Sequence, residues 1–458
     1  MSSRRRARIS IRGALVTVAI VAIILSLIIP VSLKGVTISS AQTSGPITQQ
    51  WVNQQMAQWK TSSNSSVNFG VLFPRASYDN ILFSYNTPQV ENTSLNMLLS
   101  TGASCVRIDL GYDAWLKNDT STQSTISSLV GQIRSAGRCF IIADASAESY
   151  RKQPLPWADF KTAWVQRVRT LAALFHPDYY IVIKEPGWYA PMVSDALTNP
   201  SFQDPNDWIN LTQTLVSTVQ SVSPNTKIGV SIAADSLSTN AALYTSFLTG
   251  VSKISGLSFI GFDIYTESGF QNTQNFLTQN GNGGKDVWIA ECWSGDGSGI
   301  FSSTRATLDA SWILLIYYFA QQIHALMLIP FYTDLFASYS LTSSSPTSAS
   351  QILSLYQQRT DVYQEYRNII SAASGTQTSV TTTSSISGVG STSQRTSSSA
   401  ASTQSTLRTT SSSTSSPVSY ASSNVRNRSL PLVEAGIIVV FLIVAVVVVV
   451  SLFFRRKG

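Results

Sequence analysis

Short apolar runs rich in β-branched and aromatic residues recur through the middle of the chain. They cover eight segments: Val67–Pro74, Cys105–Tyr112, Cys139–Ser146, Tyr179–Pro186, Lys227–Asp235, Ser258–Thr266, Asp286–Trp293 and Ala325–Asp334. Between them, apolar residues recur every three or four positions over 126–136, 157–175, 208–222 and 304–323, which is typical of amphipathic helices. Eight strands that alternate with helices predict an α/β protein with the (β/α)8 TIM barrel fold.

An open, doubly wound sheet is the structural alternative to a barrel. Such a sheet normally carries a glycine-rich phosphate loop after its first strand. The segment at that place, residues 73–77, reads Phe-Pro-Arg-Ala-Ser and has no glycine. The barrel is therefore favoured, and we expect it to span residues 45–373.

Both ends of the chain carry a charge-free, mostly apolar run, Ala14–Leu33 and Ala435–Phe454, each 20 residues long. A helix of about 20 apolar residues can cross a bilayer. The outer flanks, 1–13 and 455–458, are basic, which by the positive-inside rule places both in the cytoplasm. The first run is alternatively a signal peptide cleaved near Ser39–Ala41. Either reading predicts a protein of the cell membrane whose central domain is extracellular.

The segment 376–429 is a Ser/Thr-rich linker, because more than half of its residues are Ser or Thr and large apolar residues are almost absent. Such a composition predicts a disordered stalk. Five Asn-x-Ser/Thr sequons, weak signals singly, begin at Asn64, Asn92, Asn118, Asn210 and Asn427, and would make the protein a glycoprotein.

The net charge of +7 is concentrated at the two ends of the chain. Eight basic residues lie there: Arg4, Arg5, Arg6, Arg8, Arg12, Arg455, Arg456 and Lys457. Their eight positive charges exceed the net charge of the whole chain, so the rest of the chain is close to neutral. A nucleic-acid partner is therefore not expected.

Chemically active residues gather at the predicted strand ends, where the active sites of (β/α)8 barrels lie. These residues are Arg107, Asp109, Asp144, Lys184, Glu185, Asp235, Asp263, Tyr265, Glu291, Tyr332 and Asp334. The two histidines, His176 and His324, instead precede strands and should lie at the opposite face. A His-dependent triad or a His-rich zinc site is therefore not predicted, which weakens a surface peptidase as an alternative. We expect neither a metal nor an organic cofactor.

The three cysteines allow one disulfide and leave one thiol over. Cys105 and Cys139 begin neighbouring strands, but parallel neighbours rarely present suitable geometry for a disulfide. Buried free thiols are the expected state of all three, Cys292 included.

Two glutamates end apolar strands beside aromatic residues and a turn, Glu185 in 179–188 and Glu291 in 287–295. Two carboxyl groups at the mouth of one barrel can divide the work of glycosidic bond cleavage. A protonated one donates to the leaving oxygen, and an ionised one attacks the anomeric carbon. Alternatively, both are surface or ion-paired residues without a catalytic role.

These segments resemble the clan A glycoside hydrolases, the 4/7 superfamily. The resemblance rests on Lys184-Glu185-Pro186 with its lead-in 175–180, on Glu291, on Val106-Arg107-Ile108-Asp109, and on Gly261-Phe262-Asp263-Ile264-Tyr265. It implies a (β/α)8 barrel with Glu185 as acid/base and Glu291 as nucleophile. It also implies that Arg107 supports this nucleophile and that Tyr265 bonds it.

Two positions depart from the pattern of this family. Lys184 stands where the family usually has an Asn that contacts the sugar 2-hydroxyl, and 143–146 lacks a His that many members carry. The lysine leaves open whether the chain is active.

Aromatic side chains are the other expected contacts for a sugar. Trp115, Trp188 and Trp293 follow strand ends and are predicted stacking platforms, with Tyr332 and Asp263 as further substrate-binding residues. Trp164, Trp288 and Trp312 are expected in the core.

The sequence thus predicts a membrane-tethered retaining glycoside hydrolase, an endo-β-glycanase, acting on β-linked polysaccharides or oligosaccharides. The alternative is a non-catalytic glycan-binding or cell-envelope surface protein on a degenerate barrel.

Overall fold

The computed structural model describes residues 47–60, 66–73, 87–110, 120–144, 154–294, 302–343 and 348–375. All of them belong to the first of two units into which the chain divides, residues 1–381. The predicted membrane runs 14–33 and 435–454, the basic ends and the linker 376–429 lie outside the described residues. Within the described part of the chain, no helix combines the length and apolar character needed to cross a bilayer.

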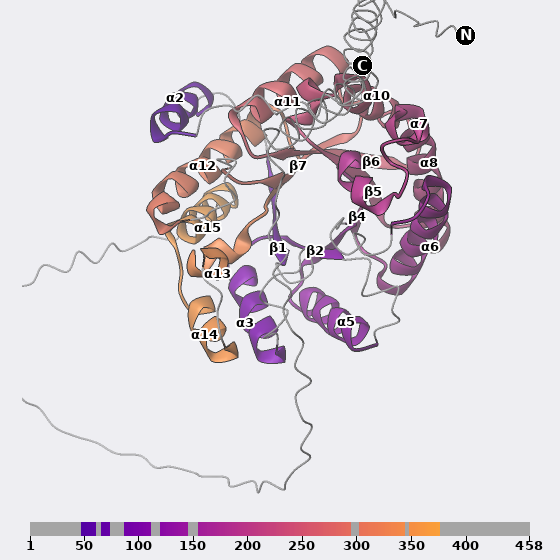
Figure 1. The fold of residues 1–458 in the computed structure, drawn as a ribbon. Helices are drawn as coiled ribbons and strands as arrows, with labels where there is room; N and C mark the ends of the chain where they lie inside the picture. Colours follow the sequence, from indigo (N-terminus) through magenta and orange to yellow (C-terminus); the bar gives the residue numbers. More distant parts are fainter. Residues whose placement is uncertain are drawn as a thin grey trace, which may run out of the picture. The chain divides into compact units, whose positions relative to one another are not determined.

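Eight parallel strands form a closed barrel in chain order, which confirms the predicted (β/α)8 fold (Figure 1). The strands are β1 (Asn68–Phe73), β2 (Cys105–Leu110), β3 (Cys139–Asp144), β4 (Tyr179–Lys184), β5 (Lys227–Ala233), β6 (Leu257–Ile264), β7 (Asp286–Cys292) and β8 (Met327–Pro330). The barrel closes because β8 pairs with β1, with Asn68 opposite Met327.

Helices surround the barrel and connect its strands (Figure 1). The α-helices are α2 (Gln49–Trp59), α3 (Pro88–Leu99), α5 (Thr120–Ser135), α6 (Trp157–Phe175), α7 (Pro200–Gln203), α8 (Pro205–Val222), α9 (Ser236–Thr239), α10 (Ala241–Val251), α11 (Glu267–Asn280), α12 (Ala306–Gln322), α13 (Ser340–Ser343), α14 (Ala349–Tyr356) and α15 (Asp361–Ala373). The described residues also include the 3-10 helices η4 (Pro186–Met192), η5 (Ser303–Arg305) and η6 (Thr333–Phe336). The predicted helix 157–175 coincides with α6.

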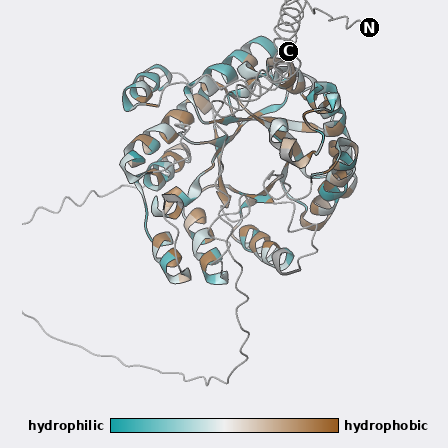
Figure 2. Ribbon diagram, viewed as in Figure 1, coloured by the Kyte–Doolittle hydropathy of each residue, from teal (hydrophilic) through white to brown (hydrophobic). Residues whose placement is uncertain are grey.

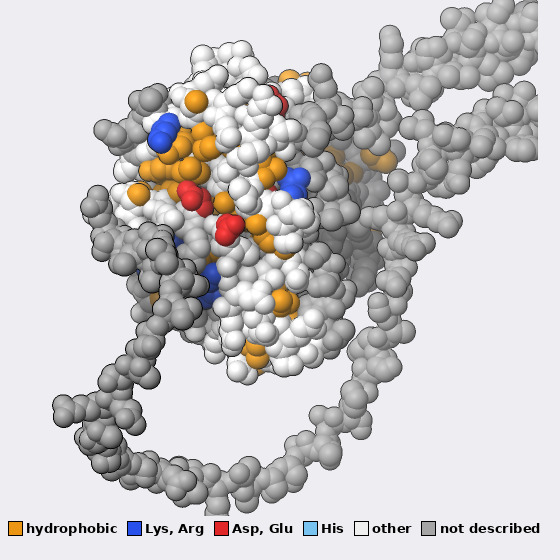
Figure 3. Space-filling model, turned by 90° about the vertical axis from the view of Figure 1, so that its left-hand side faces the viewer, with side chains coloured by type: hydrophobic (Ala, Val, Ile, Leu, Met, Phe, Trp, Pro, Cys, Tyr) orange, Lys and Arg blue, Asp and Glu red, His pale blue; other side chains and the backbone are white. Residues whose placement is uncertain are grey.

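The described part of the domain has two apolar clusters. The larger one lies between the barrel and its helices. The smaller one, called the inner cluster, lies inside the barrel and consists of Cys105, Ile141, Ala143, Ile181, Phe259, Trp288, Ala290, Met327 and Ile329. Inside, Phe259 and Trp288 stack with ring centroids 3.8 Å apart. Apolar helix positions face the sheet, and polar positions face outward (Figure 2). Trp164, Trp288 and Trp312 are fully buried, so their prediction as core residues is confirmed. Charged side chains are sparse on the flank shown in Figure 3.

Three strands contain one residue more than the neighbour with which they pair. The register places Val182 of β4 and Ser258 of β6 as extra residues against β5, and Ala290 of β7 as an extra residue against β6. Against β8, the two residues Ala290 and Glu291 lie opposite a single residue. Such bulges redirect the side chains that follow them. Ala290 belongs to the inner cluster, and the next residue, Glu291, also contacts side chains of other strands inside the barrel. The bulge therefore turns two successive residues to the same side.

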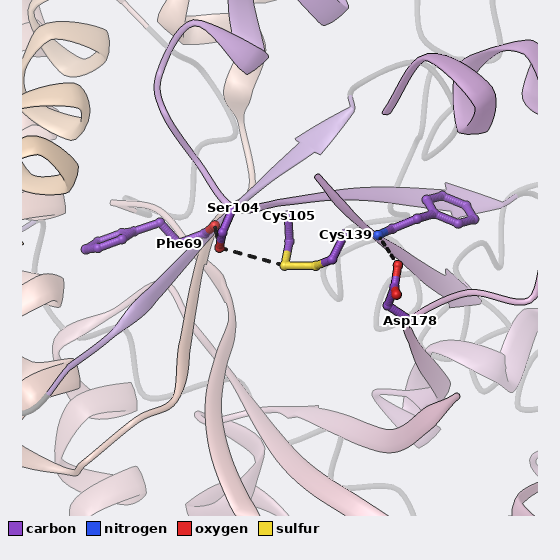
Figure 4. The surroundings of a disulfide bond; sticks show 6 residues. Phe69, Ser104, Cys105, Cys139 and Asp178 are labelled. Carbon is purple, nitrogen blue, oxygen red and sulfur yellow. Dashed lines mark hydrogen bonds between the residues drawn. A yellow bond between two sulfur atoms is a disulfide. The ribbon is translucent and has the colours of Figure 1, made fainter. Parts of the chain in front are cut away.

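A disulfide joins Cys105 and Cys139, which corrects the expectation that both are free thiols (Figure 4). The two residues are direct partners in the β2–β3 register, with Cα atoms 4.4 Å apart. Both contact the inner cluster at the strand starts, so their side chains point the same way. Nearby, the carboxylate of Asp178 accepts a hydrogen bond from the backbone N–H of Phe140 at 2.8 Å. Cys292 is a buried free thiol, as predicted.

Both histidines lie just after helices and before strands, at the face opposite the strand ends. His176 and His324 have left-handed backbone conformations, with φ of 42° and 53°. His176 ends α6, and its Nδ1 lies 3.3 Å from the hydroxyl of Ser223. Their predicted distance from the strand-end chemistry is confirmed.

Candidate active site

Glu291 is the centre of a buried polar cluster inside the barrel at the end of β7. Its Oε1 accepts hydrogen bonds from Arg107 and Lys184, and its Oε2 accepts one from the hydroxyl of Tyr265 at 2.6 Å. Only 2% of Glu291 is exposed to solvent. The contacts from Arg107 and Tyr265 are those that the family resemblance implies for a nucleophile.

Arg107 reaches Glu291 from β2 and is held in place by Asp109, two residues further along the same strand. Its Nε and Nη2 donate to the two carboxylate oxygens of Asp109 at 2.5 and 2.8 Å, and its Nη1 donates to the carbonyl of Ala290 at 2.8 Å. Residues i and i+2 of a strand lie on one face, which explains this local pair. The guanidinium group is thereby fixed in a forked geometry toward β7.

Lys184, the last residue of β4, reaches into the same cluster. Its Nζ lies 2.5 Å from Oε1 of Glu291 and 3.5 Å from Oδ2 of Asp109, and it stands 4.8 Å from the centre of the Phe331 ring. Lys184 is 7% exposed. The residue that departs from the family pattern is therefore an ion-pair partner of Glu291.

Glu185 directly follows Lys184, at the junction of β4 and η4. Its backbone is left-handed, with φ of 49°, a conformation that is uncommon for a residue with a side chain. Its N–H donates to the carbonyl of Ser231 on β5 at 2.7 Å, and the residue is 6% exposed. The turn of the chain at Glu185 thus ends β4 and places a second carboxyl group beside the cluster.

The two glutamates have opposite pKa shifts. Burial raises the pKa of Glu185 to about 7, and the charge of Glu291 adds to the rise, although Lys184 opposes it. For Glu291, burial would raise the pKa, but the charges of Lys184 and Arg107 and the hydrogen bonds of Lys184 and Tyr265 lower it below its ordinary value. At mildly acidic pH, Glu185 is therefore mostly protonated while Glu291 is ionised.

Asp263 on β6 is a third carboxyl group of the cluster. It is fully buried, accepts a hydrogen bond from the hydroxyl of Ser231 at 3.0 Å, and is the register partner of Glu291. Burial and the charges of Glu291 and Glu185 raise its pKa well above the ordinary value. Since no part of Asp263 is accessible, its predicted contact with substrate is corrected: it can act only through its neighbours.

The predicted aromatic platforms have different outcomes. Trp293 is 1% exposed and packs against Tyr332 and Phe336, with centroid distances of 6.0 and 6.2 Å. It is therefore a packing residue, which corrects its prediction as a stacking platform, because residues after β8 cover it. Tyr332 is only partly buried and remains a candidate. Trp115 lies outside the described residues, as does the side chain of Trp188.

Two other strand-end acids have local structural roles. Asp235 accepts hydrogen bonds from the hydroxyls of Thr266 and Ser268, both at 2.5 Å. Asp334 accepts one from the hydroxyl of Tyr356, also at 2.5 Å. The side chain of Asp144 is outside the described residues.

Asp109 was among the strand-end residues expected from the sequence, but its pairing with Arg107 was not predicted, although a spacing of two on a strand indicates a shared face. Three other residues around the cluster, Ser231, Tyr189 and Phe331, were not predicted, and the sequence carries no signal that indicates them. The hydroxyl of Tyr189 accepts a hydrogen bond from the N–H of Lys184 at 3.0 Å, a contact that depends on the course of η4.

The arrangement brings two carboxyl groups with opposite pKa shifts together in one buried site. Paired carboxyl groups whose surroundings push their pKa values apart are the pattern that acid/base and nucleophilic roles require. The tyrosine and arginine contacts orient Glu291, and the cluster lies at the strand ends, the face where barrel enzymes bind substrates.

No protein-family model matches the chain, and no curated protein does. Among solved structures, it is similar to a β-glucosidase from Thermotoga maritima, with 8% identity over 69% of this chain and 98% of that chain and a TM-score of 0.46. It is also similar to an exo-β-1,4-mannosidase from Opitutaceae bacterium strain TAV5, with 11% identity over 74% of this chain and 63% of that chain and a TM-score of 0.47. A β-glycosidase gives 9% identity, coverage of 68% and 96%, and a TM-score of 0.47. Identities and scores this low do not bear on activity, which is inferred from the site.

Proposed function

We propose that the protein is a retaining glycoside hydrolase that cleaves β-linked glycans with Glu185 and Glu291. The observation that carries the proposal is the pair of glutamates at the ends of β4 and β7, one with a raised and one with a lowered pKa, in a single buried cluster. Arg107 and Tyr265 contact Glu291 as the resemblance to clan A implies for a nucleophile.

The reaction proceeds in two displacements. Glu291 attacks the anomeric carbon while Glu185 gives its proton to the leaving oxygen, so that a glycosyl ester forms and the glycosidic bond breaks. Water then attacks the same carbon, Glu185 takes a proton from that water, and the carboxylate of Glu291 leaves. The anomeric configuration is retained. Lys184 and Arg107 balance the charge that Glu291 regains.

We further propose that the barrel acts outside the cell, tethered to the membrane by the apolar runs 14–33 and 435–454. The Cys105–Cys139 disulfide supports this location, because disulfides persist mainly in oxidising compartments. An extracytoplasmic enzyme on a long linker suits attack within polysaccharides, so we propose endo cleavage.

One observation favours a second candidate, a non-catalytic glycan-binding or cell-envelope protein on the same fold. The ammonium group of Lys184 forms an ion pair with Oε1 of Glu291, and a nucleophile held in an ion pair is less reactive. Saturable glycan binding without product would support this candidate.

The test measures reducing-sugar release by the full chain, purified in detergent, on β-glucans, β-mannans, β-galactans and β-xylans between pH 3 and 7. Glu291→Gln is the inactive variant, and Glu267→Gln, an exposed change on α11, is the matched control. Release that disappears only in Glu291→Gln supports the hydrolase. Proton NMR of the first product reports its anomeric configuration, and inversion would exclude the two-step mechanism. Chain-length analysis distinguishes endo from exo attack.

A further inference from the structure

The ammonium group of Lys184 has a definite place in the cluster. Its Nζ contacts Oε1 of Glu291 at 2.5 Å and Asp109 at 3.5 Å, and both partners are almost completely buried. A buried ion pair of this kind is costly to break, because removing one partner leaves the other charge without compensation. The contact is therefore more than a surface salt bridge.

The charged and titratable groups around Glu291 come from β2, β4 and β6 and from the segment after β8. They are Arg107 and Asp109 from β2, Lys184 and Glu185 at the end of β4, Asp263 and Tyr265 at the end of β6, and Tyr332 after β8. Arg107 and Lys184 are the two cations that contact Glu291. Arg107 is shared between Asp109 and Glu291, so Lys184 supplies the second positive charge beside Glu291.

We propose that Lys184 is a positioning residue whose ammonium group fixes Oε1 of Glu291 in a buried ion pair and supplies the positive charge opposite this carboxylate. This inference rests on the proposed function for its catalytic meaning, but the ion pair itself is a property of the protein without substrate. Lys184 precedes Glu185 in the chain, so one dipeptide carries the acid and the group that holds the nucleophile. The lysine thereby couples the ends of β4 and β7.

Without this charge, Glu291 would be buried beside Asp109 with only Arg107 to compensate both. Glu291 would then take up a proton at a higher pH than in the wild type. Arginine at the same position would keep the charge, whereas methionine would keep much of the volume and remove the charge. Comparison of lysine, arginine and methionine at position 184 therefore distinguishes an effect of the charge from an effect of packing.

The experiment titrates the carboxyl group of Glu291 by infrared spectroscopy in the full chain with ¹³C-labelled glutamate. The spectrum of Glu291→Gln identifies its band. Lys184→Met should move the protonation of Glu291 upward by about one pH unit or more, a tenfold change in proton affinity. Lys184→Arg should restore most of the shift, and Lys253→Met, an exposed lysine after α10, should leave it unchanged. An unchanged titration in Lys184→Met would overturn the proposal.

Folding is the second readout, in case Lys184→Met is too unstable to titrate. The double variant Lys184→Met/Glu291→Gln lacks both charges, so it should recover most of the stability that the single change removes. Failure of the double variant to recover stability would contradict the proposal, because the lysine would then act through another partner.

Activity gives a third readout that is separate from the first two. If the wild type hydrolyses a glycan, the acid limb of its kcat/KM profile should move upward in Lys184→Met. If the wild type hydrolyses none while the titration shifts as expected, the proposed function fails and the ion-pair role stands.

Discussion

Glu185 and Glu291 have opposite pKa shifts although their side chains are chemically identical. Burial is the main cause of the raised pKa of Glu185, whereas two cations lower the pKa of Glu291 against the effect of its burial. The different roles that we propose for them therefore follow from their surroundings.

We expect Glu185→Gln to lower kcat/KM by about 100- to 10,000-fold on glycans, the usual contribution of general acid/base catalysis. The loss should be much smaller for the first step on aryl glycosides with acidic leaving groups, which need little proton donation. Steady-state and burst kinetics on both substrate types measure this difference. Equal losses on both would assign Glu185 another role.

The pKa of Glu185 also predicts how stability depends on pH. Its folded-state pKa lies above its unfolded value of 4.5, so its contribution to stability is fully present below pH 4.5 and is lost as the pH rises through about 7. A rise of this size corresponds to about 3 kcal/mol. Denaturant unfolding between pH 4 and 8 should show the loss in the wild type and a flatter profile in Glu185→Gln. An equally steep profile in the variant would assign the slope to other groups.

The sequence alone was enough to select Glu185, Glu291, Arg107 and Tyr265 as candidate site residues, because each lies at or near the end of a recognisable strand. It did not reveal that Lys184 pairs with Glu291, nor that Trp293 is buried. Both depend on where a side chain points after a strand has gained a residue or ended in a turn. An alternating pattern read along one strand does not contain that information.

Three of the four strands that supply the site are irregular. β4, β6 and β7 each hold an extra residue, whereas β2, which carries Arg107, is regular. The site carboxyl groups Glu185, Asp263 and Glu291 lie at or next to the ends of these irregular strands. Their runs were predictable from apolar composition, and the order of the barrel followed from the number of runs. The extra residues were not, because a bulge changes the pairing partner without changing the composition.

The packing of β5 against β6 near the strand starts allows a test of how tightly the barrel interior is filled. A Cβ atom added to Gly229 would lie 2.3 Å from the ring of Phe259, which itself stacks on Trp288. Gly229→Ala should therefore destabilise the protein by about 1–3 kcal/mol, the usual cost of overpacking.

Gly131 in α5 is the matched control, since a Cβ added there meets nothing within 4 Å. Gly131→Ala should stabilise the protein by about 0.5–1 kcal/mol, because alanine loses less backbone entropy in a helix. Equal effects of the two changes in urea unfolding would mean that the barrel interior yields to the extra methyl group.

In the molecule as a whole, the disulfide is the feature of the fold that bears on the proposed location of the chain. Parallel neighbours rarely suit a disulfide, which is why the sequence pointed to free thiols. Here the register brings Cys105 and Cys139 directly opposite each other at strand starts, with both side chains inside the barrel. This register is known only from the structure, because the sequence does not show which residues of two neighbouring strands lie opposite each other.

The disulfide and the proposed extracytoplasmic location can be tested together. Cys105→Ser/Cys139→Ser should lower the free energy of unfolding by about 3–4 kcal/mol, because the bond closes a loop with a sequence separation of 34. Activity at low temperature should survive, since the bond lies at the strand starts and the glutamates lie at the strand ends. Reduced wild type should unfold like the double variant, which controls for the substitutions themselves. Thiol labelling of the chain in its native membranes should modify neither cysteine before reduction. Labelling of both would show that the bond is absent in the cell, and it would remove the support that the disulfide gives to a domain outside the cytoplasm.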